Sequence, residues 1–162
     1  MLAAGGAVFI GADNLRSSVR RSVDMMSSSE RYDLRLRLAE PYPAPIIETS
    51  AAAVAGVERA QAFATDDVAL VHADGNQGNA FTLIGVPPDS TMLSVNVARG
   101  RWLDARDRNV LVVSERLLRD EPGMAPNTDV TLMIGGKSGT WHVVGVDQSV
   151  LQNIAYTLRS LP

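Results

Sequence analysis

The sequence predicts an α+β fold in two parts, a strand–helix–strand unit followed by a β-rich region. Three observations support this prediction: an alternating stretch at residues 32–39, a proline-led helical pattern after it, and two pairs of apolar runs joined by turn-forming residues. The 162 residues are 46% hydrophobic and 20% charged, which is typical of a single folded domain.

The N-terminal run, MLAAGGAVFIGA (residues 1–12), is uncharged and rich in small residues. A membrane-spanning helix needs about 20 apolar residues, so this run alone is too short to cross. No basic region precedes it, and we therefore expect no complete signal peptide. Three interpretations stay open: a buried element, an interfacial segment, or the outer end of a transmembrane helix.

Residues 13–27 predict a helix that Asp13 or Asn14 caps. Its other faces carry arginines, so we expect a solvated outer side. The apolar residues at helical spacing are Leu15, Val19, Val23 and Met26.

Residues 32–39 predict a half-buried strand, because Leu34, Leu36 and Leu38 alternate with charged residues. Pro45 suits the first position of a helix, which Gly56 is placed to end. Residues 57–65 then read as a second strand. A strand–helix–strand crossover over residues 13–67 is the expected packing.

Residues 68–147 predict the β-rich lobe. The runs VALVHA and NAFTLIGV flank DGNQG and indicate a hairpin, and the stretch 130–146 indicates a second one. Between them, NVLVVS reads as a strand and SERLLRDE as a short helix with Ser114 as its cap. Residues 148–162 show helical spacing of Leu151, Ile154, Leu158 and Leu161, so a C-terminal helix is expected.

Composition excludes several classes of protein. The net charge of −3 provides no general basic field for nucleic acid. The absence of cysteine excludes a disulfide scaffold, thiol catalysis and cysteine-ligated metal.

The stretch GGKS at residues 135–138 looks at first like the end of a phosphate-binding loop. Such a loop needs a glycine five residues before its final Gly-Lys, and it must open into a helix. Thr131 occupies that position, and the strand-like TWHVVGV follows. We therefore interpret Gly135–Gly139 as a hairpin loop, with Lys137 at its tip.

The other candidate residues are also better explained by structural roles. His72 and His142 each lie in an apolar run without a second ligand at metal-binding spacing. Ser114 follows a strand but lacks the flanking glycines of a nucleophile elbow.

The paired carboxylates Asp66–Asp67 and Asp104–Asp107 lie in turn-like segments that favour capping roles. Trp102 and Trp141 are interpreted as core residues of the β-rich lobe. We predict no catalytic, cofactor-binding or metal-ligating residue, and no cofactor. The loops Asp74–Gly78 and Gly135–Gly139 are the exposed projections at which binding would first be sought.

Several motifs, taken in order, resemble the extracytoplasmic (periplasmic core) domain of MacB/FtsX-type ABC transporter permeases. The resemblance covers roughly residues 13–147, and it departs at Asn127, where a glycine is common. The motifs are Ala55 to Glu58, Gly100–Arg101–Trp102, Val112–Val113–Ser114–Glu115, Asp129–Val130–Thr131–Leu132 and Val143–Val144–Gly145–Val146.

The resemblance implies a lobe like the porter modules of efflux pumps, a smaller β-rich lobe, and a location outside the cytoplasmic membrane. It also implies a non-enzymatic role in which ATP-driven motion of a cytoplasmic ABC ATPase is relayed outward. Expected partners are the permease's transmembrane helices, the ATPase, a second permease copy, and an extracytoplasmic protein, peptide or lipid.

Residues 1–12 would then be the outer end of a transmembrane helix, and 148–162 a truncated return to the crossover lobe. A free-standing binding or adaptor domain is the alternative, and an enzyme of unrecognised type is a third possibility.

Overall fold

The computed structural model describes residues 31–159. Seven strands and two helices of this part of the chain belong to one mixed α+β unit, and a second unit is smaller. The expected segments 1–12 and 13–27 lie outside the described residues. In order, the elements are α2 (Ala44–Ala52), β1 (Ala64–Val71), β2 (Gln77–Val86), β3 (Val97–Gly100), β4 (Val110–Ser114), α3 (Glu115–Asp120), β5 (Asp129–Ile134), β6 (Lys137–Asp147) and β7 (Ile154–Leu158).

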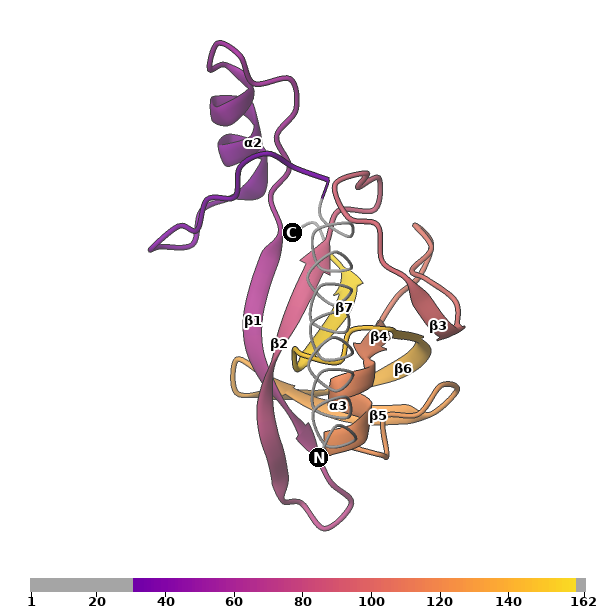
Figure 1. Ribbon diagram of the computed structural model, residues 1–162. Coiled ribbons are helices and arrows are strands. Elements are labelled where there is room, and N and C mark those ends of the chain that lie inside the picture. Colours follow the sequence, from indigo (N-terminus) through magenta and orange to yellow (C-terminus); the bar gives the residue numbers. More distant parts are fainter. Residues whose placement is uncertain (1–30, 160–162) are drawn as a thin grey trace, which may run out of the picture. The chain divides into compact units, whose positions relative to one another are not determined.

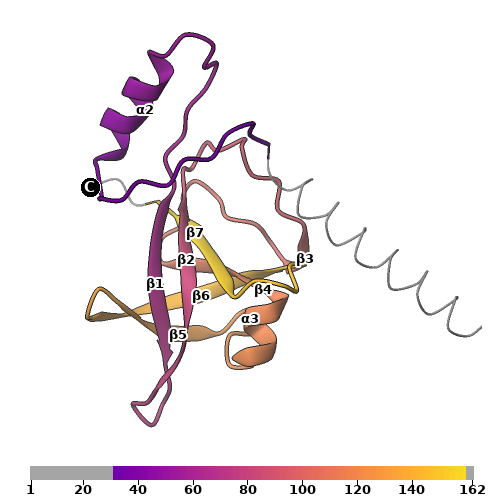
Figure 2. The same cartoon turned by 60° about the vertical axis from the view of Figure 1, so that its left-hand side comes forward.

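The strands form one sheet in the order β3-β6-β4-β7-β2-β1-β5, and β5 also pairs with β6. This additional pairing closes six strands into a barrel (Figures 1 and 2), while β3 joins β6 beyond the end of β5. β2–β7 and β4–β6 are parallel, and the remaining pairs are antiparallel. The barrel interior is apolar, and Leu111, Leu132 and Val143 have no exposed surface.

The smaller unit gathers residues 31–35 and 91–94 within the described part of the chain. The backbone N–H of Arg31 donates to Met92 O over 2.9 Å, and its guanidinium donates to Ser94 Oγ over 3.3 Å. Residues 36–90 and 95–159 belong to the larger unit, which contains every helix and strand named above.

Several expected elements are confirmed. Helix α2 begins with proline in its first turn, and Gly56 beyond its end has a φ of +91°. β1 and β2 form the first hairpin, and β5 and β6 form the second. β4 leads directly into α3, whose cap is Ser114.

The expected strand at residues 32–39 is wrong, and so is the second strand at 57–65, because β1 begins only at Ala64. Leu34 and Leu36 are 74% and 75% exposed, since no described segment pairs with this stretch. Near the second stretch, the backbone N–H of Ala62 donates to the Glu48 carboxylate instead of to a strand. The strand–helix–strand unit is therefore not formed among the described residues.

The expected C-terminal helix is also wrong, because residues 154–158 form β7. β7 lies between β2 and β4, and Ile154, Ala155, Tyr156 and Thr157 are buried in succession. A strand that is covered on both faces has an unbroken apolar run, and such a run does not distinguish strand from helix. Leu151 is 62% exposed, and Leu161 lies outside the described residues.

Gly100 lies where β3 pairs with β6, opposite Gly145. It has a φ of +75°, and a Cβ atom here would lie 2.2 Å from Val144 O. We expect Gly100→Ala to lower the free energy of unfolding by about 2–4 kcal/mol, because it adds left-handed strain to a backbone clash. Gly123→Ala is the matched control, since a Cβ there meets nothing within 4 Å. Urea denaturation measures both, and equal effects would contradict this view of the pairing.

Candidate functional site

The sequence GGKS forms a tight hairpin turn. Ile134 pairs with Lys137, so Gly135 and Gly136 are the two central residues, with φ values of 53° and 79°. Positive φ at both positions is the signature of a type I′ turn, which matches the twist of the flanking strands. The interpretation as a turn is confirmed, but the loop is shorter than expected: Lys137 is not at the tip, because β6 begins at Lys137 and includes Gly139.

The two histidines are paired with different carboxylates. His72 Nε2 lies 3.5 Å from Glu121 Oε2, and His142 Nδ1 lies 2.7 Å from Asp129 Oδ1. Among residues 31–159, no three His, Cys, Asp or Glu side chains gather closely enough to hold a metal ion. Each histidine therefore forms a local pair between neighbouring elements.

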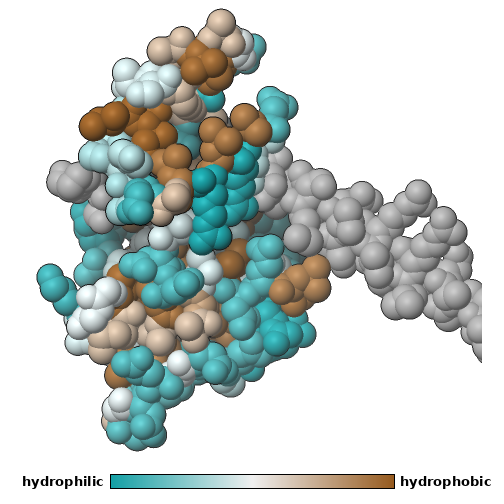
Figure 3. Space-filling view, turned by 90° about the vertical axis from the view of Figure 1, so that its left-hand side faces the viewer, coloured by the Kyte–Doolittle hydropathy of each residue, from teal (hydrophilic) through white to brown (hydrophobic). Residues whose placement is uncertain are grey.

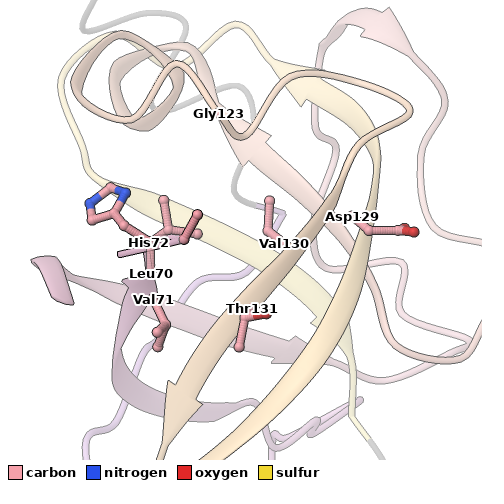
Figure 4. Close-up of a pocket in the computed structure, with 8 residues that line it drawn as sticks. Leu70, Val71, His72, Gly123, Asp129, Val130 and Thr131 are labelled. Carbon is pink, nitrogen blue, oxygen red and sulfur yellow. The ribbon is translucent and has the colours of Figure 1, made fainter. Parts of the chain in front are cut away.

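A shallow, open hollow of about 340 Å³ lies where β1 meets β5. Figure 4 shows that His72 and Asp129 point to different sides of it, while Leu70 and Val130 come from the two facing strands. The polar groups do not converge on a common point. The hollow offers no arrangement of acid and base for proton transfer.

The paired carboxylates bind protein groups. Both Asp107 oxygens accept from Arg101, at 2.7 and 2.8 Å, and one also accepts from the Asp104 backbone N–H at 2.8 Å. The hydrogen bond from Arg101, followed by that from Asp104, lowers the pKa of Asp107. Asp104 accepts from the backbone N–H of Arg106, as expected for a turn aspartate.

The expected turn placement of Asp66 and Asp67 is wrong. Both lie in β1 and are exposed, and Asp67 accepts a hydrogen bond of 3.3 Å from Thr82 on the neighbouring strand.

Ser114 is fully buried, and its hydroxyl is saturated by backbone groups. Oγ donates to Gln152 O over 2.7 Å, and it accepts from Leu117 N over 3.1 Å and from Ile154 N over 3.4 Å. The side chain thus caps α3 and joins it to the segment that enters β7. This is a structural role, as the sequence indicated.

The tryptophans pack at the barrel. The ring of Trp102 meets Tyr156 edge-on, with centroids 5.2 Å apart, and half-buried Trp141 packs against the core. The loops Asp74–Gly78 and Gly135–Gly139 contain the two hairpin turns, and their turn residues are exposed. Their use in binding stays a prediction.

Asp147 is a buried carboxyl group that sequence reasoning missed. It ends β6, where it pairs with Val97 of β3 and Ser114 of β4. Burial raises the pKa of Asp147 to about 6, although the backbone N–H groups of Ser149 and Gln148 partly offset the effect. No local motif marks this position, because the burial comes from strands distant in the sequence.

The contact between α2 and the barrel was also missed, because its partners are 111 positions apart. Arg159 Nη1, next to the end of β7, donates to Glu48 Oε1 over 2.8 Å and to Ala62 O. Glu48 also accepts from Ala62 N over 2.8 Å, and this bond, followed by the Arg159 guanidinium, lowers the pKa of Glu48. We call Glu48, Ala62 and Arg159 the tether.

The tether is substantially shielded from solvent. The Arg159 side chain is 12% exposed and the Glu48 side chain 28%, and Arg159 Nε is buried without an acceptor among the described residues. Water screens such a pair only in part, so its attraction is stronger than that of an ordinary surface ion pair, while the burial of both charges carries a desolvation cost.

No protein-family model matches the sequence, and no curated protein sequence does. Solved structures do match. The extracellular domain of the noncanonic ABC-type transporter YknZ from Gram-positive bacteria has a TM-score of 0.51 at 17% identity, covering 68% of this chain and 59% of that domain. The periplasmic region of MacB from Actinobacillus actinomycetemcomitans has a TM-score of 0.51 at 12% identity, covering 82% and 64%.

These likenesses show a shared fold, and they agree with the resemblance that the sequence motifs suggested. The chain spans less than two thirds of the length of either domain. No helix among residues 31–159 is both long and apolar enough to cross a bilayer.

Asp147 predicts a pH-dependent stability. Its pKa of about 6 lies above the ordinary value of 3.8, so between about pH 4 and 6 the folded chain holds a proton that the unfolded chain has lost. The contribution of Asp147 to stability is therefore complete below pH 4 and is lost as pH rises through 6. We expect the stability gain of Asp147→Asn over the natural chain to grow by about 2–3 kcal/mol between pH 4 and pH 7.

Urea unfolding at several pH values measures this difference. Asp66→Asn is the matched control, because Asp66 is exposed on β1. Parallel stability curves for Asp147→Asn and the natural chain would disprove the assignment.

Proposed function

We propose that this chain is a non-catalytic extracytoplasmic domain of an ABC transporter permease. The observation that carries the proposal is the fold shared with the extracellular domain of YknZ and the periplasmic region of MacB. In this proposal the domain lies on the outer side of the cell membrane, as part of a permease that works with a cytoplasmic ABC ATPase. It makes and breaks no covalent bond.

The proposed action is to relay ATP-driven motion to a partner or substrate outside the membrane. The tether supports this role, because it joins α2 to the residue that follows β7. β7 occupies the middle of the sheet order, hydrogen-bonded to β2 on one side and β4 on the other. A displacement of α2 would therefore act on a strand that is hydrogen-bonded on both sides within the barrel. The remaining expected partners are a second permease copy and an extracytoplasmic protein, peptide or lipid.

A free-standing extracytoplasmic adaptor with the same fold is the alternative. It would share the outer location but would need no ATPase. The two proposals differ in what accompanies the chain in the cell.

To distinguish the permease from the adaptor, the native protein is tagged in its source cells and the membranes are isolated. The proteins that co-purify with it after mild solubilisation are then identified. The permease proposal predicts an ABC ATPase in stoichiometric amount, and protease added to intact spheroplasts should reach the barrel. Recovery in the soluble extracytoplasmic fraction without an ATPase would favour the adaptor. A barrel protected from protease until the cells are lysed would refute both.

The tether yields a prediction about the isolated chain. Arg159→Gln removes the guanidinium that joins Glu48 to Ala62 O, so α2 should lose its main polar attachment. We expect amide hydrogen exchange across α2 to quicken at least about tenfold, while exchange in β4 and β6 changes little, because local openings are independent of global unfolding. Arg106→Gln is the control, since Arg106 is exposed in a turn. Equal quickening throughout the barrel would show a general loss of stability instead.

A further inference from the structure

The segment that joins β6 to β7, residues 148–153, is fastened by backbone hydrogen bonds to two other parts of the barrel. The N–H of Gln148 donates to Asn96 O over 3.0 Å, next to the start of β3. Ser149 O accepts from the N–H of Arg116 over 3.1 Å, in the first turn of α3. We call residues 148–153 the link. Its position depends on this hold on α3 and on the residue before β3.

Asp147 immediately precedes the link, and its carboxyl group is buried without a cation. The residue is only 7% exposed, and it forms no ion pair within residues 31–159. The arginines of β3 and α3 pair with other carboxylates, since Arg99 lies 3.9 Å from Glu115 and Arg116 lies 3.1 Å from Asp120. A buried carboxylate without a cation is costly, so this environment favours the protonated form.

The charges around Asp147 act in the same direction. β4, the link and residues 91–96 contain no ionisable side chain, and Glu115 adds the repulsion of a like charge. The N–H groups of Gln148 and Ser149 favour the ionised form, but burial outweighs them and raises the pKa of Asp147 to about 6. Asp147 therefore changes its charge near pH 6, at the point where the link begins.

We propose that the link is a proton-controlled latch. It is fastened to α3 and to the start of β3 while Asp147 carries a proton, and it loosens when Asp147 is ionised. This inference concerns a local movement of residues 148–153, beyond the effect of Asp147 on the stability of the whole chain. It does not depend on the proposed function.

The direction of the effect follows from the linkage between opening and proton binding. An opening of the link takes Gln148 and Ser149 away from Asp147 and lets water reach its carboxyl group. The closed form holds the proton up to about pH 6, whereas a hydrated aspartic acid loses it near 3.8. Opening is therefore least favourable in acid and becomes more favourable as pH rises through 6.

The latch governs exposed apolar residues of the link itself. Val150 and Leu151 are 38% and 62% exposed. Figure 3 shows another gathering of apolar side chains, over α2, which Arg159 attaches beyond the end of β7. A change of pH should therefore move Val150 and Leu151 and leave α2 in place.

The test is amide hydrogen exchange on the full chain labelled with ¹⁵N, with each rate divided by that of an unstructured peptide at the same pH. We expect the protection of Arg116 and Gln148, whose N–H groups fasten the link, to fall about tenfold from pH 5 to pH 7.5 and then to level off. Gly75, whose N–H donates to His72 O within the hairpin turn, is the reference and should keep its protection. Val113 of β4 reports opening of the whole barrel, and it should exchange more slowly than Arg116 and Gln148.

Two variants assign the effect to Asp147. Asp147→Asn cannot ionise, so the protection of Arg116 and Gln148 should become independent of pH. Glu115→Gln removes the like charge and should reduce the loss of protection by roughly twofold. Asp66→Asn, at an exposed position of β1, is the control and should retain the full loss. Unchanged urea midpoints at pH 5 verify that each variant is folded.

Four outcomes would overturn the proposal. They are constant protection of Arg116 and Gln148 between pH 5 and 7.5, an equal loss at Gly75, an undiminished loss in Asp147→Asn, and exchange of Arg116 and Gln148 at the rate of Val113. The last result would leave the effect of Asp147 on global stability but remove the local latch. None of them bears on whether an ABC ATPase co-purifies, so this inference and the proposed function fail separately.

Discussion

Strand β6 is the element on which the barrel depends, because it pairs with three other strands. Its first half pairs with β5, its last residues pair with β3, and its opposite edge pairs with β4. The β5–β6 pairing turns an open sheet into a closed ring, and closure removes the free edges that otherwise recruit other strands. Gly100 and Gly145 lie opposite each other where β3 pairs with β6, and a side chain on either would meet backbone atoms. The hairpin turn at Gly135 and Gly136 sets the register in which β5 pairs with β6.

Sequence reasoning succeeded where a few neighbouring residues determine the structure. Two glycines with positive φ specify a tight turn, a proline in the first turn favours a helix start, and a serine hydroxyl caps the helix that follows β4. The same local signals excluded a phosphate loop at Lys137 and a nucleophile at Ser114. The resemblance to the permease domains also came from the order of the short motifs along the chain, although no single motif was specific.

Sequence reasoning failed where distant segments decide the outcome. Residues 32–39 alternate like a strand, yet a strand requires a partner, and none of the described residues provides one. Residues 154–158 were assigned to a helix because successive residues of β7 are buried, which removes the period-two pattern. The burial of Asp147 and the tether between Glu48 and Arg159 have the same origin. Both features bring together residues that lie far apart in the sequence.

The barrel and the segment 36–57, which contains α2, differ in the forces that hold them. The barrel is held by buried apolar side chains and closed strand pairing, so its polar groups are largely satisfied by one another, as at Ser114 and Asp107. Groups already bonded in this way have little left to offer a substrate. The segment 36–57 is joined by a few polar contacts and keeps several large apolar side chains exposed. Recognition requires accessible groups and transmission requires a stiff body, so under the proposed function the segment 36–57 would suit the first and the barrel the second.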